Sequence, residues 1–134
     1  SCTFSGGCTL SVIDAGNGTN GGLLSSTPAY LIPSVSSTFS LVSTTLIAGI
    51  EGYGISAATS SAGSGGNLTL ASRYASTTLG TNGVGQLTTT TVAIASSTAA
   101  ITSREVVVNH KAAISGLTLP GSYSDTITYS CAGN

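Results

Sequence analysis

Apolar and hydroxyl-bearing side chains alternate strictly along both ends of this chain. Because successive side chains of a β-strand point to opposite faces, a period of two predicts a strand with one buried face. At the N-terminus the apolar face of such a strand would carry Cys2, Phe4, Gly6, Cys8, Leu10 and Val12. The same period recurs over residues 105–114. Near the C-terminus it places Tyr123, Ile127, Tyr129 and Cys131 on one face.

Shorter β-forming segments lie between these runs. We expect strands at residues 29–32, 38–46, 54–58, 67–74 and 86–95. Glycine- or proline-containing turns separate them at residues 16–22, 63–66, 80–85 and 120–121. No window carries apolar residues at helical spacing with caps. The pattern predicts an all-β chain folded as an Ig-like Greek-key β-sandwich.

Charge is scarce and excludes several classes of partner. Charged residues make up 5% of the 134 residues, against about 25% in an ordinary soluble domain. The three basic residues cannot form the cluster that neutralises nucleic-acid phosphates or binds an anionic membrane surface. A chain with so little charge tends to associate. We therefore expect its partners to be copies of itself, with no nucleic acid among them.

The composition also indicates a secreted protein. Three cysteines, two near the start and one near the end, fit an oxidising compartment. The chain has no Met and starts at Ser1, as expected of a mature product whose signal sequence has been removed. The best apolar stretch, residues 41–50, is interrupted by hydroxyl side chains and cannot span a bilayer. We expect a location outside the cell or on its surface.

Residues suited to catalysis or metal binding are few. A Ser–His–Asp triad would have to use His110, the single histidine, which lies within an alternating strand run. The four carboxylates are scattered along the sequence, which gives no support to paired acid–base chemistry. A zinc site could be assembled from Cys2, Cys8, Cys131 and His110, but the usual close cysteine pair is missing. We expect no enzyme, no metal and no cofactor.

Two sequons mark candidate glycosylation sites. They are Asn17-Gly18-Thr19 and Asn67-Leu68-Thr69. Both adjoin glycine-rich turns, where a glycan would be sterically acceptable.

The cysteines allow two disulfide arrangements. If residues 2–12 form one strand, Cys2 and Cys8 lie on one face about 20 Å apart and cannot bond to each other. The first and last strands of an Ig-like sandwich lie side by side, which brings an N-terminal cysteine within reach of Cys131. We prefer Cys8 to Cys2 as that partner. A chain reversal at Gly6-Gly7 would instead join Cys2 to Cys8 and leave Cys131 free.

The segment from Leu119 to Tyr129 resembles the closing strand of archaic chaperone–usher pilins and spore-coat-U-like proteins. The matching positions are Gly121, Tyr123, Asp125 and Thr126, which form the pattern Gly-x-Tyr-x-Asp-Thr. In that family each subunit lacks one strand, and the N-terminal extension of the next subunit fills the groove. The resemblance implies a filament subunit that meets a periplasmic chaperone and an usher before assembly.

The alternating N-terminal run is similar to such a donor segment, in which a small residue occupies one inward position. We expect residues 1–13 to be the donor strand and residues 14–134 to form the sandwich that a neighbour's donor completes. The polymerisation residues would be Phe4, Gly6, Cys8, Leu10 and Val12. The predicted function is a structural subunit of a pilus- or fimbria-like extracellular filament.

A monomeric Ig-like module that mediates adhesion or binds carbohydrate on a bacterial surface is the alternative. Such a module would present exposed aromatic rings for stacking on sugars. The chain has no Trp, and its five Tyr mostly fall within strand runs. This composition favours the filament subunit.

Overall fold

A computed structural model describes residues 1–35, 44–76 and 83–134. These residues are almost entirely strands and connecting turns, which confirms the all-β prediction for the described ranges. In chain order the strands are β1 (Cys8–Asp14), β2 (Gly22–Ser26), β3 (Ala29–Pro33), β4 (Thr44–Thr45), β5 (Gly52–Thr59), β6 (Ser64–Gly65), β7 (Thr69–Leu70), β8 (Gly83–Val84), β9 (Val92–Ser96), β10 (Ile101–Thr102), β11 (Val106–Ala113) and β12 (Ile127–Gly133). Within the same ranges, no helix has the length and apolarity needed to cross a membrane.

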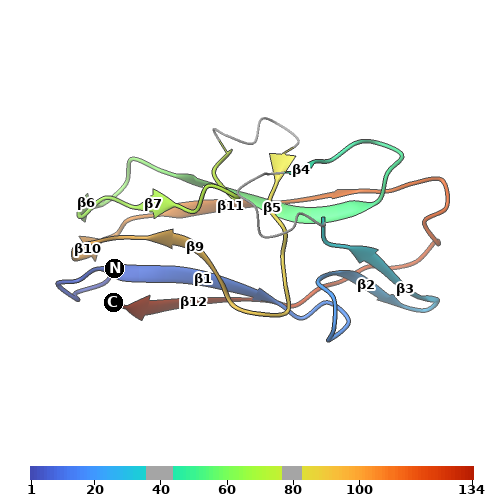
Figure 1. Ribbon diagram of the computed structural model, residues 1–134, viewed down its shortest axis with the longest axis horizontal. Coiled ribbons are helices and arrows are strands. Elements are labelled where there is room, and N and C mark those ends of the chain that lie inside the picture. The colour runs from blue at the N-terminus through green and yellow to red at the C-terminus, as the bar shows by residue number, and fades with distance from the viewer. Residues whose placement is uncertain (36–43, 77–82) are drawn as a thin grey trace.

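The first and last strands of the chain lie side by side in the largest sheet (Figure 1). Its order is β12-β1-β9-β7, and all neighbours in it are antiparallel. β1 and β12 pair over their whole length, from Cys8 opposite Gly133 to Asp14 opposite Ile127. This pairing places the two termini at the same end of the molecule.

β5 and β11 form the second layer of the fold. They pair antiparallel from Val106 opposite Thr59 to Ala113 opposite Gly52. On its other side β5 makes an isolated bridge from Ile55 to Gly85, directly after β8. β2 and β3 form a hairpin at the end of the molecule away from the termini (Figure 1).

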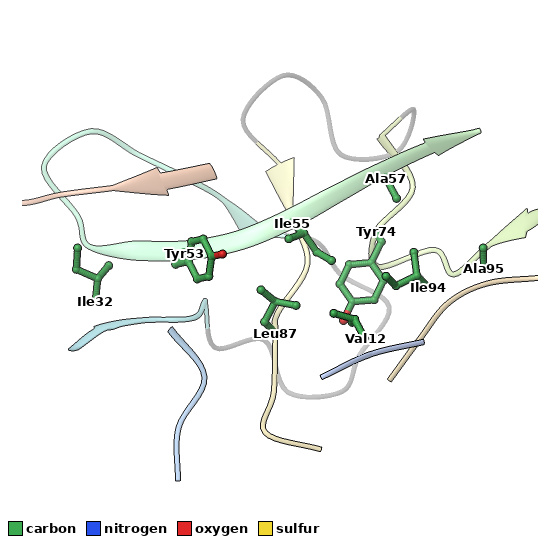
Figure 2. Close-up of a cluster of buried hydrophobic side chains, with 9 residues drawn as sticks. All are labelled: Val12, Ile32, Tyr53, Ile55, Ala57, Tyr74, Leu87, Ile94 and Ala95. Carbon is green, nitrogen blue, oxygen red and sulfur yellow. The ribbon is translucent and has the colours of Figure 1, made fainter. Parts of the chain in front are cut away.

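The two layers enclose a common apolar core (Figure 2). β5 contributes Tyr53, Ile55 and Ala57, while β1 and β9 contribute Val12, Ile94 and Ala95. Tyr74 lies among them and is fully buried. Its hydroxyl donates a 2.7 Å hydrogen bond to the Gln86 carbonyl, so the polar end of the ring is paired inside the core. Burial of each large side chain stabilises the fold by about 1.5–3 kcal/mol.

Several predicted strands are shorter in the structure because their backbone groups bond elsewhere. The strand predicted at residues 86–95 begins at Val92. Before it, the Leu87 amide donates to the Ser34 hydroxyl at 2.8 Å, and the Thr88 carbonyl accepts from the Asp14 amide at 3.0 Å. These bonds attach the segment to other parts of the fold and replace a regular ladder.

Two further predictions about strands need correction. The strand predicted at residues 67–74 is reduced to Thr69–Leu70, because the chain then turns and the Tyr74 amide bonds to the Ala71 carbonyl at 2.9 Å. β2 begins at Gly22, inside the region where the sequence predicted only a turn. Most of the strand predicted at residues 38–46 lies outside the described residues, which include only its last part.

Replacement of Ile55 by Ala tests the core. Ile55 is fully buried in β5, so we expect Ile55→Ala to lower the free energy of unfolding by about 2–5 kcal/mol. Ile50→Ala removes the same atoms from a side chain that is 60% exposed. Its effect should stay within about 0.5 kcal/mol. Denaturant unfolding of both variants measures the difference, and equal losses would contradict this description of the core.

Candidate functional site

The candidate site is β1 together with the slot that it fills between β12 and β9 (Figure 1). Its side chains alternate as the sequence predicts. Cys8, Val12 and Asp14 are buried, and Leu10 on the same face is partly buried against the core. Both edges of β1 are hydrogen-bonded, to β12 along the whole strand and to β9 with a register shift between Leu10 and Ser11. The slot therefore satisfies both the backbone and the apolar face of the strand.

The predicted donor strand is too long at its N-terminal end. The chain turns at Ser5 and Gly6, where the Gly7 amide donates to the Phe4 carbonyl at 2.9 Å. Gly7 has φ of 85°, and a Cβ on it would lie 2.0 Å from the Ser97 carbonyl oxygen. Only glycine satisfies both conditions. The turn leaves Phe4 and Gly6 exposed and outside β1, so these two do not belong to the inward row that the sequence predicted.

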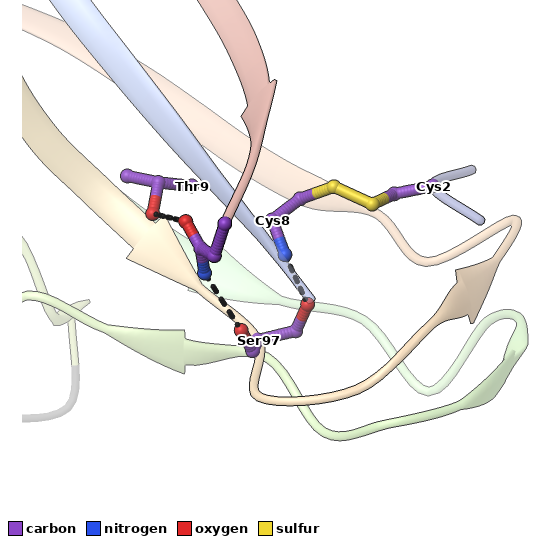
Figure 3. Close-up of a disulfide and its surroundings, with 5 residues drawn as sticks. Cys2, Cys8, Thr9 and Ser97 are labelled. Atoms are coloured by element: carbon purple, nitrogen blue, oxygen red, sulfur yellow. Dashed lines mark hydrogen bonds between the residues drawn. A yellow bond between two sulfur atoms is a disulfide. The ribbon is translucent and has the colours of Figure 1, made fainter. Parts of the chain in front are cut away.

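The same reversal decides the disulfide. Cys2 bonds to Cys8, with their Cα atoms 6.4 Å apart (Figure 3). Cys131 is a free, exposed cysteine. The pairing of Cys8 with Cys131 that we preferred from the sequence is therefore not the one found. The premise that residues 2–12 are extended is wrong, and the alternative with a turn at Gly6-Gly7 holds.

Polar contacts fasten the start of β1 to its neighbours. The Cys8 amide donates to the Ser97 hydroxyl at 3.0 Å (Figure 3). Asn134 accepts a 2.8 Å hydrogen bond from the Thr9 hydroxyl and donates a 3.2 Å bond to the Ser97 carbonyl. The backbone of Cys2 exchanges two hydrogen bonds with Ile101. Contacts with Ser97, Asn134 and Ile101 thus attach the disulfide-closed loop to three separate segments of the fold.

A pair of carboxyl groups lies at the other end of β1. The Gly22 amide donates to Asp14 Oδ2 at 3.1 Å, and the Gly16 amide donates to Asp125 Oδ1 at 3.2 Å. The other two oxygens, Asp14 Oδ1 and Asp125 Oδ2, are buried without an N–H or O–H donor among the described residues. Two carboxylates cannot bond to each other unless one holds a proton, so we predict that this pair shares a proton.

Burial and the charge of Asp125 raise the pKa of Asp14 from 3.8 to about 7. Sequence reasoning missed this pair because Asp14 and Asp125 belong to distant segments. The sequence did contain a signal for each residue. Asp14 continues the row of inward-facing side chains after Val12, and Asp125 is the Asp of the Gly-x-Tyr-x-Asp-Thr pattern.

A glycine-rich connection follows Asp14 and leads to β2. It includes Gly16 and Gly18, both with positive φ. The Asn17 side chain accepts hydrogen bonds from the amides of Thr19 and Asn20, at 3.0 and 2.8 Å. These bonds are local, whereas the amides of Ala15 and Gly16 donate to the Thr126 carbonyl and to Asp125, so the start of the connection opens only when these two bonds break. Asn17 and the other sequon residue, Asn67, are both exposed, and their glycosylation remains a prediction.

His110 lies at an open edge between the two layers. Its Nδ1 is 2.9 Å from the Tyr53 hydroxyl, and its Nε2 is 3.1 Å from the Tyr129 hydroxyl. Burial raises the pKa of Tyr53 and of Tyr129. The histidine therefore bridges β5 and β12 through tyrosine hydroxyls. Among the described residues no group of three or more His, Cys, Asp or Glu side chains could hold a metal ion.

The Asp14–Asp125 pair predicts how stability depends on pH. The pKa of Asp14 is raised in the folded state, so its contribution is complete below about pH 4 and is lost as pH rises through about 7. We expect the free energy of unfolding to fall by up to a few kcal/mol between pH 5 and pH 8. Glu51 titrates below this window, because hydrogen bonds from Thr118 and Tyr30 lower its pKa.

Asp14→Asn is the matched variant, because its amide can donate to Asp125 at every pH. Denaturant unfolding across the window should show a smaller slope for the variant than for the unmodified protein. Parallel slopes for the two proteins would contradict the shared proton.

The chain was compared with known protein families, curated proteins and solved structures. No protein family, curated protein or solved structure matches it. The geometry of β1 and its slot is therefore the basis on which a function is assigned.

Proposed function

We propose that this protein is the structural subunit of an extracellular filament in which β1 of each copy occupies the slot of the next. The observation that carries the proposal is the position of β1. It is an N-terminal strand, yet it lies inside a sheet, with β12 on one side and β9 on the other. The complete fold would be an Ig-like Greek-key sandwich whose donated strand comes from a neighbour.

Exchange of β1 between copies preserves its favourable contacts. Withdrawal would leave two unpaired sheet edges and uncover the pocket that buries Val12. An identical strand from another copy restores the same ladder and the same burial. The free-energy difference between the closed and the exchanged form is then limited to the connection and to the entropy of association.

The connection after β1 suits a hinge. Residues 15–21 span up to about 23 Å when extended. Extending them releases longer-range hydrogen bonds, among them the Ala15 amide to the Thr126 carbonyl and the Ser34 amide to the Gly21 carbonyl, while the bonds around Asn17 are local. A strand that leaves one copy and enters the next makes a head-to-tail contact, which grows as a filament when the rotation between copies does not close a ring. The proposed donor is thus residues 1–14, one residue longer than the sequence suggested, because Asp14 ends the buried row.

Composition supports the same conclusion. A chain in which 5% of the residues are charged makes a poorly soluble free monomer and suits a subunit packed against copies of itself. A disulfide fits export to an oxidising compartment. Before assembly an exposed slot would need protection, which is the role that the resemblance gives to a periplasmic chaperone and an usher.

A disulfide between two different copies tests the exchange. Ser11 on β1 lies directly opposite Ser130 on β12, and both point away from the core row. In a Cys131→Ser background, Ser11→Cys chains and Ser130→Cys chains are unfolded together without reductant, refolded as a mixture and mildly oxidised. We expect a crosslinked heterodimer on a non-reducing denaturing gel, since opposed strand positions are within disulfide reach.

The control pairs Ser11→Cys with Asn109→Cys, an exposed position on β11 in the other layer. This mixture should give no heterodimer above background. Electron microscopy of the unmodified protein should show filaments. Single particles, together with no Ser11–Ser130 crosslink, would overturn the proposal and favour a monomeric module.

A further inference from the structure

The free cysteine lies beside the disulfide, although the two are distant in sequence. The β1–β12 register sets Cys8 opposite Gly133 and Cys131 opposite Leu10. Cys8 and Cys131 are therefore diagonal neighbours on one face of adjacent strands, a relation that separates Cα atoms by about 7–8 Å. A disulfide between them requires the ends of β1 and β12 to move slightly closer together. They line two cavities together, one of about 160 Å³ with Leu10 and one of about 270 Å³ with Cys2.

Of the three cysteines, Cys2 and Cys8 are buried and Cys131 is exposed. Gly133 lies two residues after Cys131. The Phe4 ring occupies the space that a Cβ on Gly133 would need. Phe4 also lines the larger of the two cavities. Cys131 itself is exposed, so solvent reaches its thiol.

We propose that Cys131 exchanges with the Cys2–Cys8 disulfide and becomes bonded to Cys8. The Cys131 thiolate attacks Cys8 Sγ, the bond between Cys2 and Cys8 breaks, and Cys2 leaves as a thiolate that takes up a proton from solvent. One thiol and one disulfide are present before and after the step, so it needs no oxidant. Cys8 is the sulfur attacked because the ladder holds it beside Cys131.

The consequence depends on which copy supplies β1, and this part rests on the proposed function. Within a closed monomer the new bond joins β1 to β12 of the same chain. In a filament Cys8 belongs to the donor and Cys131 to the recipient, so the same exchange joins consecutive copies covalently. Each joint then carries one disulfide across a contact that was held only by hydrogen bonds and burial.

Thiol mapping tests the exchange in either assembly state. The protein is held at pH 8.5 and acid-quenched, and its free thiol is then labelled under denaturing, non-reducing conditions. We expect the label to shift from Cys131 to Cys2 with time. The matched control, Cys131→Ser with Ala132→Cys, moves the thiol to the other face of β12 and should keep its label at position 132. A label that stays on Cys131 would overturn the exchange.

A non-reducing denaturing gel of assembled material separates this inference from the proposed function. Exchange between copies predicts a ladder that reductant collapses to monomer and that Cys131→Ser abolishes while filaments persist in the microscope. A shifted label without a ladder confirms the exchange within one chain and contradicts the covalent joint between copies. Dimers linked through Cys131 alone, with Cys2–Cys8 intact, would overturn the inference.

Discussion

The antiparallel ladder between the first and last strands is the interaction on which the rest of the structure depends. It spans all of β1 and all of β12, and it places an N-terminal segment inside a sheet. Val12 enters the core from β1 and meets side chains of β5 and β9 there. Without this ladder β12 would separate from the rest of the sheet, and the core would lose the side chain of Ile127, which β12 packs against it.

The two ends of β1 are secured by different chemistry. At the start, a disulfide and a group of neutral hydrogen bonds hold a compact loop against β10 and the end of β9. At the C-terminal end of β1, burial and the charge of Asp125 raise the pKa of Asp14. We therefore expect the N-terminal end of β1 to respond to redox conditions and its C-terminal end to respond to pH.

The strands with strict alternation were predictable from the sequence. Residues 8–14 and 106–113 form strands where the period of two is clearest, because that period matches the pleat directly. The turn at Gly6-Gly7 interrupts an equally regular pattern, because the close approach of Gly7 to Ser97 is a tertiary constraint that alternation does not encode. The error carried through to the disulfide, since an extended segment would have kept Cys2 away from Cys8.

The candidate site was only partly predictable. Cys8, Leu10 and Val12 occupy the inward row that the sequence proposed, while Phe4 and Gly6 do not. The carboxyl pair depends on a register between distant segments, and the sequence alone could not supply that register. β2 was missed because its glycine start reads as a turn, although Leu24 pairs with Ser124 and so fixes the segment before β12.

The direction of the β1–β12 ladder has a mechanical consequence. In the proposed filament, tension reaches β1 through its Asp14 end, because residues 15–21 connect it to the donor's body. Ile127, the residue opposite Asp14, leads back into the recipient's own fold. Such a pull enters and leaves the ladder at the same end, so it peels the rungs one by one and does not load them all at once in shear. Resistance to force would then follow the rate of rupture and not the equilibrium stability.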